Sequence, residues 1–230
     1  MIKWKYGLLL IVASIFCSES KGQALIALLL GNKVKNDKIH VGIYLGASTS
    51  WIANAPGQTP RIGFAIGAYT TYAWKENWEI AIDIVMKSPK GGKKLGYGDS
   101  FTVPTDSIFH GEEFNRLQTY LSFAPLIRYK WNPSWGLALG PYFAARIKSK
   151  DVYTIHDDKV DQSYTYNSKS DTHLVDVGLS FDMQYVLMKG KGIRINAGFN
   201  LGLTNFYKDK AKTAYQRQVL LGVGIPIGQK

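Results

Sequence analysis

Charged residues recur along one face of the segments in which apolar and polar residues alternate. Buried charges are tolerated only when they are paired and hydrogen-bonded. We therefore predict that these side chains pair with one another inside the fold and leave no wide pore; the alternative is a charged passage or gate. Lys130 and Lys148 share this face. The predicted members of the network are Glu79, Asp83, Arg116, Arg128, Arg146, Asp176, Asp182 and Arg194.

Residues suited to nucleophilic catalysis are present without a catalytic spacing. Such chemistry needs a hydroxyl nucleophile beside a histidine base. His110, His156 and His173 lie near serines in the polar connections, but no spacing matches a hydrolase motif. We expect no enzyme, no catalytic residue, no metal and no cofactor; a lipid A-modifying enzyme is the alternative that this chemistry leaves open.

The charged residues lie on segments that alternate with a period of two, the pattern of a β-strand with two different faces. The clearest runs from Trp78 to Lys87, with Ile80, Ile82 and Ile84 on one face. Each segment has about ten residues or more, enough to cross a bilayer as a tilted strand. The eight segments span residues 39–49, 61–74, 78–87, 116–131, 135–148, 175–185, 193–204 and 218–227.

The connections between these segments alternate in length. Those after the second, fourth and sixth segments are short, at residues 75–77, 132–134 and 189–192. The others are longer, at about 50–60, 88–115, 149–172 and 207–213. Short turns at one end and long loops at the other are typical of outer-membrane barrels. The pattern predicts an all-β fold, an eight-stranded antiparallel up-and-down transmembrane β-barrel.

Four tryptophans at two of the short turns indicate which face meets lipid. Trp74 and Trp78 flank one turn, and Trp131 and Trp135 flank another. Tryptophan concentrates where a barrel crosses the lipid–water boundary, because its ring is apolar and its N–H stays hydrated. A soluble barrel such as a lipocalin would turn the apolar face inward, but aliphatic residues from every strand would overfill an eight-stranded interior. We therefore predict that the apolar face contacts lipid.

The start of the chain reads as an export signal. Two lysines precede a short apolar stretch, and small residues follow at the end of residues 1–22. Cys17 would allow lipoprotein processing instead, although Phe16 before it fits that processing poorly. Residues 23–38 read as a short apolar helix ended by a glycine, followed by a spacer, and residues 39–230 form the barrel.

The formal charge of +11 suggests an anionic neighbour. Export makes nucleic acid a poor candidate, so we expect outer-membrane lipid and lipopolysaccharide as partners, with an envelope protein as a further possibility. Lys90 and Lys212 also fall in the predicted outer loops. The residues predicted to contact lipid phosphates are Lys93, Lys94, Lys208 and Lys210.

The chain resembles the PorT-like family of outer-membrane β-barrels of Gram-negative bacteria. The resemblance rests on the apolar start at residues 23–31, on the glycine-rich residues 41–46 and on residues 122–129. It implies a location in the bacterial outer membrane. It also implies either a structural or accessory role or, as in the family's namesake, participation in type IX protein secretion; a subunit of an uptake assembly is a related alternative.

Overall fold

The computed structural model describes residues 38–55, 57–99, 104, 107–155, 162–190, 192–209 and 213–227. The predicted signal peptide and almost all of the predicted helix and spacer lie outside these residues. The helices of the described part are the short segments η1 (Tyr97–Asp99), η2 (Ser107–Phe109) and α3 (Leu187–Gly190). None of them is long and apolar enough to cross a membrane.

Eight strands close into one antiparallel ring, which confirms the predicted fold class. The ring order is β4-β3-β2-β1-β9-β8-β7-β5, and pairing of β4 with β5 closes it. A ninth strand, β6, extends β5 outside the ring. The strands are β1 (Ile39–Ala53), β2 (Thr59–Lys75), β3 (Trp78–Leu95), β4 (Phe114–Lys130), β5 (Trp135–Ile155), β6 (Gln162–Tyr166), β7 (Val175–Val186), β8 (Arg194–Gly202) and β9 (Tyr215–Ile227).

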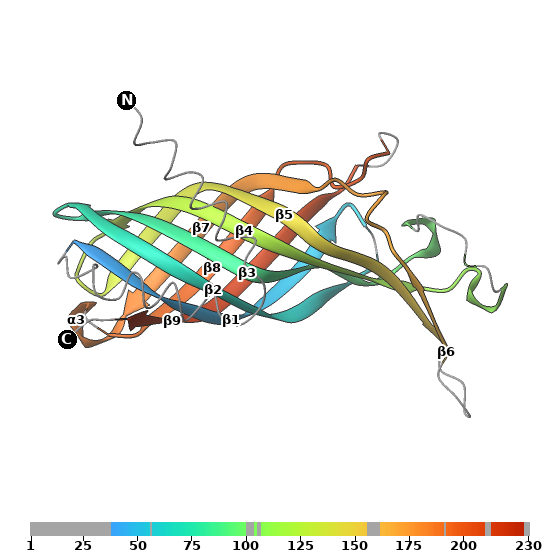
Figure 1. The fold of residues 1–230 in the computed structure, drawn as a ribbon, viewed down its shortest axis with the longest axis horizontal. Coiled ribbons are helices and arrows are strands. Elements are labelled where there is room, and N and C mark those ends of the chain that lie inside the picture. Colours follow the sequence, from blue (N-terminus) through green and yellow to red (C-terminus); the bar gives the residue numbers. More distant parts are fainter. Residues whose placement is uncertain are drawn as a thin grey trace, which may run out of the picture.

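The two ends of the barrel differ as the connection lengths predicted. Figure 1 shows strongly tilted strands, with α3 at one end and the β5–β6 hairpin projecting beyond the barrel at the other. We call these the turn end and the loop end. At the turn end the ring centroids of Trp78 and Tyr129 lie 5.0 Å apart, and those of Trp135 and Tyr185 lie 4.7 Å apart. All four predicted interface tryptophans are exposed there.

Large apolar side chains cover the outside of the barrel. On β5, Leu137, Leu139 and Phe143 are exposed, while Ala138, Tyr142 and Ala144 between them are buried. The other outward strands repeat this alternation. Such a surface is stable in hydrocarbon, because the closed ring leaves no open sheet edge facing lipid.

The strands at the loop end are longer than the sequence predicted. β1 runs to Ala53, β3 to Leu95 and β5 to Ile155, so the expected loops at about 50–60, 88–115 and 149–172 are partly strand. The reason is a change of pattern. Beyond the lipid-facing part, apolar residues such as Ile52 and Tyr153 are buried inside, and Lys148 and Lys150 are exposed outside. A search for apolar outward faces therefore ends each strand too early.

One close approach between strands gives a stability prediction. A Cβ on Gly67 of β2 would collide with the backbone carbonyl oxygen of Ile84 on β3. We expect Gly67→Ala to lower the free energy of unfolding by about 1–3 kcal/mol, the usual cost of overpacking. Urea titration of the folded, heat-modifiable band would measure this. Gly96→Ala, where nothing lies within 4 Å of the added Cβ, is the control and should unfold like the unmodified protein.

Candidate functional site

The interior of the barrel holds three polar clusters stacked from the turn end to the loop end. Nearest the turn end, Arg128 on β4 lies between two acids. Its Nη2 donates to Asp182 Oδ1 at 2.8 Å, and its Nη1 lies 3.7 Å from Glu79 Oε2. Lys130 Nζ donates to Glu79 Oε1 at 3.0 Å, and Asn196 Nδ2 donates to Asp182 at 3.0 Å. The structure thus brings together three of the predicted network residues and Lys130.

The middle cluster is centred on Lys90 and Asp176, both almost completely buried. Lys90 Nζ donates to Asp176 Oδ2 at 2.7 Å, and Tyr142 Oη donates to the same oxygen at 2.8 Å. Lys90 Nζ also lies 4.5 Å from the ring centroid of Tyr142 and 5.1 Å from that of Tyr120, within cation–π range. Lys90 was predicted to lie in an outer loop. That is wrong, because β3 continues past the predicted strand end and carries this side chain inside.

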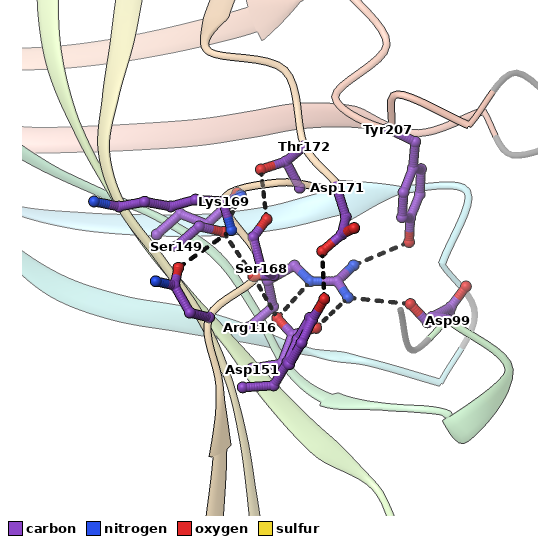
Figure 2. A network of polar contacts seen from close by, with 12 residues as sticks. Asp99, Arg116, Ser149, Asp151, Ser168, Lys169, Asp171, Thr172 and Tyr207 are labelled. Atoms are coloured by element: carbon purple, nitrogen blue, oxygen red, sulfur yellow. Dashed lines mark hydrogen bonds and ion pairs between the residues drawn. The ribbon is translucent and has the colours of Figure 1, made fainter. Parts of the chain in front are cut away.

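The third cluster, at the loop end, is centred on Arg116 (Figure 2). Its guanidinium donates to both carboxylate oxygens of Asp151, with Nε–Oδ1 at 2.8 Å and Nη2–Oδ2 at 2.6 Å. It also donates to Tyr207 Oη at 3.0 Å and to the carbonyl oxygen of Asp99 at 3.1 Å. Ser168 Oγ donates to Asp151 Oδ1 at 3.2 Å. Arg116 therefore ties the β3–β4 and β8–β9 connections to the barrel wall, and its partner Asp151 holds Ser168 of the β6–β7 connection.

An apolar cluster covers this third polar cluster. We call it the cap: Ile52, Leu95, Phe109, Phe114, Tyr153, Phe206, Tyr207 and Ala214, all buried. The rings of Phe114 and Tyr153 stack with centroids 5.2 Å apart. Burial raises the pKa of Tyr207 above its ordinary value, so its hydroxyl stays protonated and can hydrogen-bond near neutral pH. The cap joins β1, β3, β4, β5 and the connection between β8 and β9.

Two of the remaining predicted network residues, Arg194 and Arg146, have partners other than acids. Arg194 donates to Thr71 Oγ1 at 3.2 Å, and its guanidinium lies 4.5 Å from the ring centroid of Tyr69. Arg146 donates to the carbonyl oxygens of Thr172 and Lys169, both at 2.8 Å, so it binds the connection after β6 rather than an acid.

The placement of Lys148 on the charged face was wrong. The β4–β5 register shifts where Thr119 pairs with Lys148 and Tyr120 with Arg146. Such a β-bulge adds one residue to a strand and reverses the alternation beyond it. Lys148 is exposed for this reason.

A small cavity of about 50 Å³ separates the first two clusters. Asp83, Arg128, Asp182 and Arg194 contribute to its wall. By volume it has room for roughly three or four water molecules. The cavity is far smaller than the passage of a general porin.

The histidines considered for catalysis and the lysines predicted to contact lipid phosphates are not members of these clusters. His110 Nε2 is 2.9 Å from the carbonyl oxygen of Pro104. His156 and Lys210 lie outside the described residues. Lys93 and Lys94 are exposed at the end of β3, and Lys208 Nζ donates to the carbonyl oxygen of Ser170 at 2.6 Å. Within the described part of the chain, no group of three histidine, cysteine or acidic residues could hold a metal ion.

Comparisons with known proteins identify the family to which the sequence belongs. The sequence model of the outer membrane protein beta-barrel domain matches residues 31–208. Among solved structures, the attachment invasion locus protein Ail of Yersinia pestis is similar at 13% identity, over 82% of this chain and 99% of that one, with a TM-score of 0.43. OprG of Pseudomonas aeruginosa is similar at 11% identity, over 82% of this chain and 93% of that one, with a TM-score of 0.38. No curated protein matches the chain.

Proposed function

The chain belongs to the outer membrane protein beta-barrel family and lies in the bacterial outer membrane, and from this premise we propose that it is a barrel with a closed lumen and a structural or accessory role in the envelope. The observation that carries the proposal is the filled interior. Three clusters of paired charges and a cap occupy the space that a porin leaves to water. We also propose, on the sequence resemblance described above, that the barrel is PorT-like.

The polar interior suits this role better than catalysis. Eight charged side chains of its described part are held in ion pairs, and an ion-paired arginine or carboxylate is not free to transfer protons at neutral pH. We propose that the protein has no enzymatic activity. Its exposed Lys93 and Lys94 would face the anionic headgroups of lipid and lipopolysaccharide if the loop end faces the cell exterior.

The second candidate function is a subunit of a type IX secretion or uptake assembly. The observation that favours it is the projecting β5–β6 hairpin. In the described part of the chain, β6 pairs with β5 alone, and three of its five residues are exposed. An exposed strand edge can accept a strand from a partner protein.

Affinity purification from native outer membranes in mild detergent, followed by mass spectrometry, separates the two candidates. We expect the tagged protein to be recovered with lipid alone. Stoichiometric recovery of another envelope protein, lost on deletion of residues 156–166, would establish the assembly role instead.

The closed lumen can be tested by reconstitution in a planar bilayer with KCl on both sides. We expect no steady conductance from the unmodified protein, because the three clusters of paired side chains and the cap occupy the described interior. An empty-detergent preparation is the control for bilayer leakage. Steady open channels would contradict the proposal.

A further inference from the structure

Asp83 and Arg194 are two predicted network residues that face one cavity without a direct counter-ion. Both line the cavity of about 50 Å³ that separates the first two clusters. Among the described residues, no ion pair includes Asp83, and Arg194 donates to the hydroxyl of Thr71 rather than to an acid. An uncompensated charge inside a protein is costly, so each of these two side chains needs a further partner.

The two charged side chains approach each other around Tyr69. In the ladder between β2 and β3, Tyr69 lies directly opposite Asp83, so their side chains are neighbours on the inner face of the sheet. The guanidinium carbon of Arg194 lies 4.5 Å from the centroid of the Tyr69 ring. Three strands separate β3 from β8 in either direction around the ring. A bridge between Asp83 and Arg194 therefore connects opposite sides of the barrel.

Unpartnered polar atoms are concentrated in the wall of this cavity. In the described part of the chain, eight buried side-chain nitrogen and oxygen atoms have no hydrogen-bond partner. Five of the eight belong to residues that line the cavity: Arg128 Nε and Nη1, Ser122 Oγ, Gln184 Oε1 and Tyr69 Oη. Buried polar atoms are normally hydrogen-bonded. Five exceptions around one cavity indicate that a bound molecule supplies the hydrogen bonds.

The chemistry of the wall defines the class of that molecule. The wall contains two arginines and two aspartates, Arg128, Arg194, Asp83 and Asp182. Their charges cancel, so a bound ion of either sign leaves a net charge in the interior. The N–H groups of Arg128 need an acceptor and Gln184 Oε1 needs a donor. Water is neutral and both donates and accepts, and the volume accommodates several water molecules.

From this geometry we propose that the cavity binds a cluster of water molecules that bridges Asp83 to Arg194 and connects β3 with β8. The same waters complete the hydrogen bonds of Arg128 and Gln184. A water-mediated contact is nearly as favourable in enthalpy as a direct one, so the two charges are compensated without touching. The water site goes beyond the proposed function, since it is independent of whether the barrel acts alone or in an assembly.

Nuclear magnetic resonance of the unmodified protein in detergent micelles tests the water site directly. We expect cross peaks between water and the Nε–H protons of Arg128 and Arg194. Their signs should be opposite in laboratory-frame and rotating-frame Overhauser spectra, which distinguishes bound water from proton exchange. The peaks should persist in Ser122→Ala and Thr71→Val, because a hydroxyl that exchanges with bulk water could otherwise relay the signal.

A double-mutant cycle tests the bridge between the two charges. Asp83→Asn and Arg194→Gln each leave the other charge without its water-mediated partner, whereas the double variant leaves neither. We expect the double variant to raise the equilibrium constant of unfolding less than the product of the two single effects, by at least about threefold. The matched control combines Asp83→Asn with Lys189→Gln, an exposed lysine at the turn end, and these two effects should multiply.

Three results would overturn the proposal. The first is the absence of the water cross peaks at either arginine of the unmodified protein, a result that does not depend on any variant folding. The second is a cycle in which the effects of Asp83→Asn and Arg194→Gln simply multiply. The third is a bound ion: replacing sodium chloride by choline gluconate, whose bulky ions do not fit the cavity, would then destabilise the unmodified protein more than the double variant.

Discussion

Replacing Arg116 by alanine is expected to detach the cap from the barrel and to lower the free energy of unfolding by about 3–5 kcal/mol. The guanidinium is completely buried and makes two bonds to Asp151 and one each to Tyr207 and the Asp99 carbonyl. Its removal leaves the Asp151 carboxylate buried without its cation, which costs more than the ion pair contributes. Urea titration in detergent micelles, followed by tryptophan fluorescence and the folded band, would measure the loss.

Two variants separate the buried charge from the lost packing. Lys150→Ala changes the exposed neighbour of Asp151 and should leave unfolding unchanged. The double variant Arg116→Leu/Asp151→Leu removes both charges together, and we expect it to recover most of the stability lost in Arg116→Ala. If Arg116→Ala unfolds like the unmodified protein, the third cluster does not hold the cap in place.

The sequence predicts best the part of each strand that faces lipid. In the lipid-facing half, bulky apolar residues alternate with small or charged ones, so Ile80, Ile82 and Ile84 identify both a strand and its outward face. Two of the three short turns are marked by flanking tryptophans. Arg128 and Asp182 both lie on the inward face of their strands, and a period of two is sufficient to place them inside.

The loop end was less predictable because its pattern is reversed. There the interior is apolar and the outside is polar, as in a soluble protein. Ile52 and Tyr153 therefore appeared to belong to loops, and Asp151 was not identified as a partner of Arg116. The signal that marks the longer strands is a change of phase in the alternation, because the apolar residues move from the outer face to the inner face. Following it past the change predicts strand ends closer to those observed.

Lys90 illustrates a different limit. A lysine followed by two glycines in a polar stretch has the local features of a solvated turn. Its burial depends on Asp176, 86 positions later in the chain, and on tyrosines from two other strands. No local pattern contains that information, since the contacts arise only when the ring closes.

An arginine in the middle of the lipid-facing surface is expected to destabilise the protein strongly. Phe181 of β7 is 44% exposed and points outward, four residues from Tyr185 at the turn end. We expect Phe181→Arg to lower the free energy of unfolding in phospholipid vesicles by about 2–4 kcal/mol, the cost of placing this charge at the centre of a bilayer. Urea titration in vesicles of defined composition would measure it.

The matched control places the same charge at another depth. Val175 begins the same strand near the loop end and is 48% exposed, so Val175→Arg should cost only about 0–1 kcal/mol. Both side chains are similarly exposed, which means that depth in the bilayer is the variable that separates them. A soluble barrel would accept arginine equally at the two positions, because both would face water. Equal costs would therefore contradict the orientation of the apolar face, while a clear difference would position the bilayer along β7.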